Sequence, residues 1–71
     1  MSNLKDIRVA AGLSQSQLAA LSGVSVRMVQ YYEQGYKDIN KASIDAAFRL
    51  ATALNCSVED LIEKNRLDPH L

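Results

Sequence analysis

The sequence has one cysteine, one proline and no long apolar run. The proline, Pro69, lies outside every predicted helix, and the other two scarcities exclude classes of protein. Cys56 has no second cysteine for an internal disulfide and no histidine beside it in the sequence, which disfavours a catalytic or metal-binding thiol. No stretch approaches the roughly 20 apolar residues that cross a bilayer, and the first residues lack the apolar run of a signal peptide. We therefore expect a cytoplasmic protein with no metal and no other cofactor.

Net charge is also absent, although most nucleic-acid-binding domains are basic. The charges are nevertheless distributed unevenly. Residues 1–50 hold six basic and four acidic residues, whereas residues 51–71 hold two basic and four acidic residues. The two segments thus carry charges of +2 and −2, and such a dipolar molecule can turn its basic end towards phosphate.

The composition is that of an ordinary folded domain, with 48% hydrophobic and 23% charged residues in 71 positions. A chain of this length forms one domain with a thin core, so a second subunit is physically plausible. We predict a folded domain over residues 1–64 and a disordered tail over residues 65–71.

Apolar residues recur at helical spacing in five segments, and no strand-like alternation of useful length is present, so the predicted fold class is all-α. The predicted helices cover residues 3–11, 15–22, 26–34, 43–54 and 57 to about 64. Ser14, Ser25 and Ser57 are candidate N-caps, and Gly12, Gly23 and Gly35 follow the first three helices as terminators. Residues 36–41 are predicted to form a polar loop.

The apolar positions predict which faces are buried. Leu18 and Leu21 form the apolar edge of the second helix, and Tyr32 with Met28 or Val29 faces inward from the third. The fourth helix carries the broadest stripe, which we predict to be buried as the core strut: Ile44, Ala47, Phe48, Leu50, Ala51 and Leu54.

Residues 14–35 combine a serine cap, Gln15, a Leu-Ala pair, a Gly-Val-Ser turn and Glu33-x-Gly35. This pattern resembles the helix-turn-helix motif of the lambdoid phage repressor, Cro and XRE-type transcriptional regulators. Residues 43–61 are similar to the closing helices of the same family. The resemblance implies a compact five-helix, lambda-repressor-like DNA-binding domain.

The implied function is a sequence-specific transcriptional regulator, a repressor, which reads an operator major groove with the helix at 25–34. Its outward face would contact bases through Ser25, Val26, Arg27, Gln30 and Tyr31. Arg27 can form two hydrogen bonds with guanine, Gln30 can pair with adenine, and Val26 can touch a thymine methyl. The resemblance also implies a structural Glu33, which either bonds near the turn or pairs with a neighbouring base such as Arg8.

Phosphate contacts are expected at two helix N-termini and in the loop between the third and fourth helices, where N–H groups or basic side chains favour an anion. The residues concerned are Gln15, Ser16, Lys37, Asn40, Lys41 and Ser43. The resemblance also suggests a homodimer on a palindromic operator. The candidate interface residues are Leu54, Asn55, Cys56, Val58 and Leu61. The alternative is that the same side chains close the core of one chain.

Two other functions are less well supported by the sequence. An antitoxin-like module that neutralises a partner protein is the alternative, because members of the family also serve in that way. An enzyme is not expected, since the sequence has no nucleophile–base pair, phosphate-binding loop or metal-ligand cluster.

Overall fold

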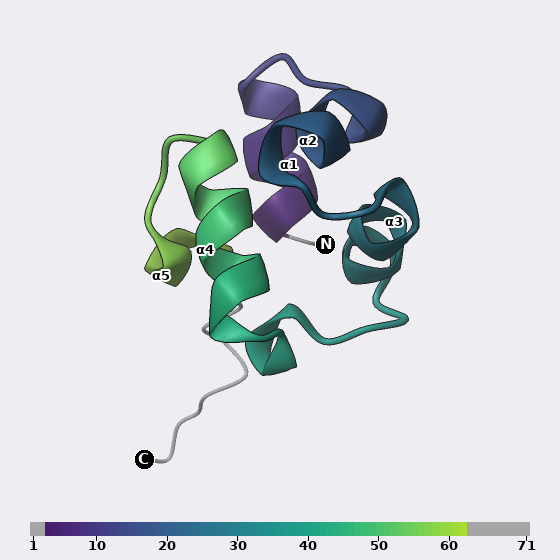
Figure 1. Cartoon of the computed structure of the whole chain (residues 1–71), viewed down its shortest axis with the longest axis vertical. Coiled ribbons are helices and arrows are strands. Elements are labelled where there is room, and N and C mark those ends of the chain that lie inside the picture. The colour runs from purple at the N-terminus through teal and green to yellow at the C-terminus, as the bar shows by residue number, and fades with distance from the viewer. Residues whose placement is uncertain (1–2, 63–71) are drawn as a thin grey trace.

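The computed structural model describes residues 3–62, which form five α-helices and one short 3-10 helix with no strand among them (Figure 1). The elements are α1 (Asn3–Ala10), α2 (Gln15–Ser22), α3 (Val26–Gln34), η1 (Ile39–Lys41), α4 (Ile44–Ala53) and α5 (Val58–Leu61). The all-α prediction is confirmed. The predicted end of the fifth helix near residue 64 and the predicted tail lie outside the described residues. No helix within 3–62 is both long and apolar enough to cross a membrane.

Serine side chains define where four of the helices begin. Ser14, Ser25, Ser43 and Ser57 each accept a hydrogen bond from a backbone N–H three residues later. Each bond satisfies one of the N–H groups that a first helical turn leaves without a partner. The predicted caps at Ser14, Ser25 and Ser57 are thereby confirmed. Ser14 also forms a full capping box with Gln17, which the Ser-x-x-Gln spacing could have predicted.

The core is built from one fully buried residue of each α-helix. Leu4, Leu18, Val29, Leu50 and Leu61 are the largest fully buried side chains among the described residues, and they come from α1 to α5 in order. Tyr32, Ile39, Ala51 and Leu54 complete the cluster. Because every helix contributes, the orientation of α3 is fixed by contacts that involve the whole domain.

The helices surround this core with α3 on one side and α4 and α5 on the other (Figure 1). The second helix, α2, packs against both α3 and α4, whereas α1 packs against α3 and α5. The third helix, α3, is therefore supported by α1 and α2, and within residues 3–62 the residues on its opposite side are exposed or half-buried.

The prediction that Ile44 and Phe48 are buried is wrong. Ile44 is 88% exposed and Phe48 is 62% exposed. The apolar residues of α4 extend over too wide an arc for one buried face, and the helix turns Ala47, Leu50, Ala51 and Leu54 inward instead. Leu21 on α2 is likewise 63% exposed, while Leu18 on the same helix is fully buried.

The polar loop predicted at 36–41 contains a short helix. Ile39–Lys41 form η1, and the side chain of Asp38 caps it by accepting a hydrogen bond from the N–H of Asn40 at 2.9 Å. Ile39 is buried in the core. The connection from α3 to α4 is thus anchored at its centre by one apolar side chain.

Val29→Ala should lower the free energy of unfolding by about 2 kcal/mol, because it removes two buried methyl groups and leaves a cavity. Val9→Ala is the matched control, since Val9 also lies in a helix but is 57% exposed, and its effect should stay within about 0.5 kcal/mol. Urea unfolding of both variants measures the difference. Equal losses would contradict the assignment of the core.

Candidate nucleic-acid interface

A tight turn sets the angle between α2 and α3. Gly23 ends α2 with φ of +75°, a left-handed conformation that a residue with a Cβ adopts at a cost. The buried hydroxyl of Ser22 donates to the carbonyl of Ala19 and accepts from the N–H of Val24, at 3.4 and 3.1 Å. Ser25 then caps α3. Only three residues separate the two helices, as the motif predicted.

The exposed face of α3 carries the five predicted base-contacting residues. Ser25, Val26 and Arg27 are exposed at its N-terminal end, and Gln30 and Tyr31 are half-buried one turn later. Residues on the opposite face, Val29 and Tyr32, are buried as predicted. The periodicity of 3.6 residues places four of them, Val26, Arg27, Gln30 and Tyr31, on one side of the helix, and Ser25 precedes them as its N-cap.

Two tyrosines shape the far end of this face. The rings of Tyr31 and Tyr36 meet edge to face, with centroids 5.8 Å apart and planes at 83°. The carbonyl of Tyr31 also accepts hydrogen bonds from the N–H groups of Tyr36 and Lys37, at 2.9 and 3.2 Å. These contacts attach the start of the α3–α4 connection to the end of α3, and no feature of the sequence pointed to them.

A buried ion pair supports α3 from behind. Arg8 on α1 donates from Nε to Oε2 of Glu33 at 2.6 Å and from Nη2 to Oε1 at 3.1 Å. The two side chains are 11% and 3% exposed. Arg8 also donates to the carbonyl of Leu13 at 2.8 Å, so that one guanidinium joins α1, α3 and the chain before α2. The predicted pairing of Glu33 with Arg8 is confirmed.

Two glutamine side chains connect this ion pair to the exposed face of α3. Gln15, at the start of α2, donates to Oε1 of Glu33 at 3.0 Å. Its own amide oxygen accepts from Nε2 of Gln30 at 3.4 Å. Sequence reasoning placed Gln15 near phosphate and Gln30 near a base but missed the link between them, because the spacing along the chain does not predict it.

The carboxylate of Glu33 is held ionised by these neighbours. Burial alone would raise its pKa, but hydrogen bonds from Arg8 and Gln15 and the positive charges of Arg8 and Lys5 outweigh burial. The pKa of Glu33 therefore lies below its ordinary value of 4.5. An ionised, fully bonded carboxylate suits a structural role, which is the role expected for it.

The predicted phosphate-contacting residues lie at the start of α2, in the connection from α3 to α4, and at the cap of α4. Ser16, Lys37, Lys41 and Ser43 are exposed, whereas Gln15 and Asn40 are half-buried. The hydroxyl of Ser43 accepts from the N–H of Ala46 at 3.0 Å as the cap of α4. Arg27, Lys37 and Lys41 form no ion pair with any residue in the range 3–62. Their charges are therefore available to an anionic ligand.

The five residues predicted for a dimer interface differ widely in exposure. Leu54 and Leu61 are 6% and 1% exposed and close the core of this chain. Cys56 and Val58 are half-buried and pack against the same core, and burial raises the pKa of the Cys56 thiol. Asn55 is exposed, with φ of +56° at the junction of α4 and α5.

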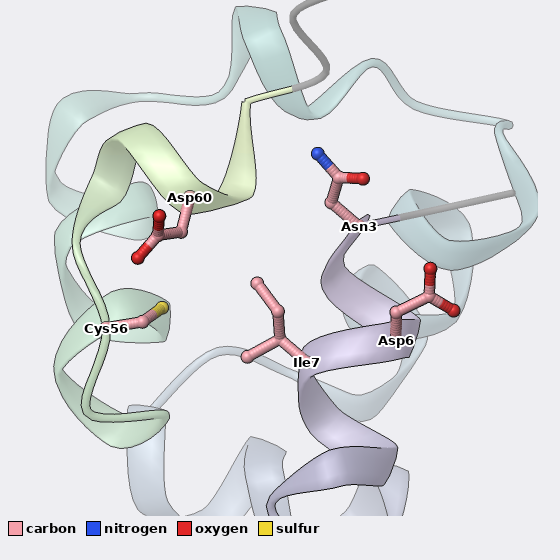
Figure 2. Close-up of a pocket in the computed structure, with 5 residues that line it drawn as sticks. All are labelled: Asn3, Asp6, Ile7, Cys56 and Asp60. Carbon is pink, nitrogen blue, oxygen red and sulfur yellow. The ribbon is translucent and has the colours of Figure 1, made fainter.

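Cys56 also lines a hollow between α1 and α5 (Figure 2). Figure 2 shows Cys56 and Ile7 pointing towards one another, with Asp60 beside them. Asn3 and Asp6 complete the lining. The lining thus includes two carboxylates, Asp6 from α1 and Asp60 from α5.

Comparison with known proteins agrees with this geometry. The helix-turn-helix family model matches residues 4–61. The crystal structure of the restriction-modification controller protein C.AhdI from Aeromonas hydrophila is similar, with a TM-score of 0.75 and 37% sequence identity over 84% of this chain and 86% of that chain. None of the curated proteins matches the chain. The family match extends from α1 to α5.

Glu33→Gln should lower the free energy of unfolding at pH 7 by roughly 2 to 4 kcal/mol, because it leaves Arg8 without a buried counter-charge. A carboxyl whose pKa is lower in the folded state stabilises the protein above its unfolded pKa and loses this contribution as the pH falls through the folded pKa. The deficit of the variant should therefore shrink on acidification below pH 4.5.

Urea unfolding at several pH values measures this deficit. Asp45→Asn is the control for loss of an exposed carboxylate, since the side chain of Asp45 is 74% exposed, and it should cost less than about 1 kcal/mol at pH 7. A deficit for Glu33→Gln that stays constant between neutral and acidic pH would contradict the described role of the ion pair.

Proposed function

The chain belongs to the XRE-type helix-turn-helix family and is a DNA-binding transcriptional regulator, and from this premise we propose that it is a repressor that inserts α3 into the major groove of an operator. The observation that carries the proposal is the exposed face of α3, held in place from behind by the buried pair of Arg8 and Glu33. A regulator of this kind acts in the cytoplasm.

Base recognition is assigned to the N-terminal half of α3. Arg27 is exposed and has no counter-charge among residues 3–62, so its guanidinium can donate two hydrogen bonds to O6 and N7 of a guanine. Ser25 and Val26 lie beside it, and Gln30 and Tyr31 follow one turn later. This arrangement allows several successive bases to be read by one helix.

Phosphate binding is assigned to the elements on either side of α3. The start of α2 offers backbone N–H groups with Gln15 and Ser16, and the start of α4 offers them with Ser43. Lys37 and Lys41 add positive charge in the connection between α3 and α4, near Asn40. These contacts would fix the register of the protein on the duplex without reading its sequence.

We further propose that two copies bind a palindromic operator. In a symmetric dimer the two α3 helices would enter successive major grooves about 34 Å apart. The family match and the likeness to a controller protein favour this regulator over an antitoxin-like module that neutralises a partner protein. No enzymatic activity is proposed, because the matched family consists of DNA-binding regulators.

Selection of bound duplexes from a random pool tests the proposal directly. We expect enrichment of one palindromic sequence, which the parent protein binds far more tightly than its scrambled counterpart. Equal binding of the selected and scrambled duplexes would show that the protein does not read sequence.

Arg27→Ala should weaken binding to the selected site by about 1 to 3 kcal/mol and relax the preference at one base position. Arg27→Lys is the matched variant, because it keeps the charge and loses the two-pronged donor geometry. It should relax the same position while keeping the salt dependence of the parent. The measurement is the affinity of each variant for duplexes that carry each of the four bases in turn at every position of the selected site. An unchanged base preference in both variants would refute the assignment of Arg27.

Lys41→Ala should weaken binding to every duplex by a similar factor, because a phosphate contact carries no sequence information. The plot of log K against log salt concentration should become less steep by about 1, as expected for the loss of one released counterion. Measurements on selected and scrambled duplexes at several salt concentrations check both effects. A loss restricted to the selected site would instead place Lys41 near a base.

A further inference from the structure

A series of hydrogen bonds runs from the buried ion pair to the exposed face of α3. Nε2 of Gln15 donates to Oε1 of Glu33 at 3.0 Å, and Oε1 of Gln15 accepts from Nε2 of Gln30 at 3.4 Å. The carboxylate at one end is 3% exposed, whereas Gln15 and Gln30 are half-buried. Glu33, Gln15 and Gln30 thus form a glutamine relay that joins α3 to the start of α2.

The carboxylate of Glu33 sets the direction of both bonds in the glutamine relay. Glu33 is ionised and paired with Arg8, and an ionised carboxylate only accepts hydrogen bonds. Gln15 must therefore turn its NH2 group towards Glu33, which leaves its amide oxygen directed at Gln30. Gln30 in turn must approach that oxygen with an N–H group. The NH2 end of the Gln30 amide is thereby held at Gln15, and its oxygen points elsewhere.

This orientation leaves Gln30 with one donor and one acceptor for a ligand. A glutamine side chain has two N–H donors and one carbonyl oxygen, and the glutamine relay uses one of the donors. The remaining N–H and the oxygen match the major-groove edge of adenine, which offers an acceptor at N7 and a donor at N6. Guanine has acceptors at both N7 and O6, so the amide oxygen would face O6 without a hydrogen between them.

We propose that Gln15 is a positioning residue for base recognition, which through the glutamine relay fixes the amide of Gln30 so that Gln30 selects adenine and rejects guanine. The inference rests on the proposed function, in which Gln30 faces a base, and it names the residue that decides which base is chosen. Gln15 keeps one N–H outside the relay, which suffices for the phosphate contact assigned to it.

Loss of Gln15 should change specificity as well as affinity. Without the oxygen of Gln15, Gln30 regains its second N–H and its amide is free to rotate, so that both N–H groups can meet the two acceptors of guanine. A residue that only bound phosphate would instead weaken binding to all sequences alike. The ratio of affinities for adenine and guanine at the position read by Gln30 therefore distinguishes the two roles.

Gln15→Met tests this ratio, because methionine is also long, unbranched and a good helix former but has no amide. The position read by Gln30 is identified as the one where Gln30→Ala abolishes the base preference. The parent protein should prefer adenine to guanine there at least about tenfold, and Gln15→Met should reduce the ratio to about threefold or less. The preference at the position read by Arg27 should persist. Ser16→Ala is the comparison for loss of a phosphate contact, and it should weaken both duplexes equally.

Nuclear magnetic resonance of the side-chain amides tests the glutamine relay without DNA. Nitrogen relaxation of the Gln30 NH2 group should show restricted motion in the parent protein and greater motion in Gln15→Met. Gln34 is the control, since it is exposed at the end of the same helix, and its amide should be mobile in both proteins. The measurement on the parent decides the matter if Gln15→Met fails to fold.

Three results would overturn the proposal. The first is a folded Gln15→Met variant with the adenine-to-guanine ratio of the parent, and the second is a parent protein in which the Gln30 amide moves as freely as that of Gln34. The third is a parent that reads sequence but does not prefer adenine at a position controlled by Gln30. A parent that binds all duplexes equally would contradict the proposed function instead, while the motion of the Gln30 amide would still decide whether the relay exists.

Discussion

The presentation of α3 depends above all on the buried ion pair between Arg8 and Glu33. Two charges removed from water are costly, and they are tolerated here because each is satisfied by further hydrogen bonds, from Gln15 to the carboxylate and from the guanidinium to the carbonyl of Leu13. These bonds require α1, α3 and the start of α2 to hold fixed relative positions. The apolar core brings the helices together, and the ion pair with its hydrogen bonds joins α1, α3 and the start of α2 at one point.

Local signals in the sequence predicted the start of most helices, because a cap acts over three or four residues. The serines at 14, 25 and 57 are followed by helices as predicted, and the bounds of α2 and α3 match the predicted ranges. The inward face of α3 also followed from periodicity, since Val29 and Tyr32 leave a polar face opposite. These signals were enough to predict the all-α fold, whereas the family was identified from the resemblance of residues 14–35 and 43–61 to known regulators.

Other features depend on tertiary contacts that no local pattern contains. Helical spacing shows that α4 is apolar over a wide arc, but it does not show which part of that arc meets the core, and so Ile44 and Phe48 were misplaced. The burial of Ile39 and the link from Gln15 to Gln30 likewise join residues through space. Periodicity brought the base-contacting candidates to one face, while their assignment to DNA required the family resemblance.

Each α-helix contributes one fully buried residue to the core, so α2 and α3 cannot be moved to another protein without the helices that cover them. A peptide containing α2 and α3 would carry Leu18 and Val29 without the side chains of α1, α4 and α5 that cover them, and two short helices do not hold their shape in water without such a covering. The outer face of α3 therefore cannot be excised as a fragment that keeps its shape. Redesign of its preference has to proceed by exchanging outward side chains on an otherwise intact scaffold.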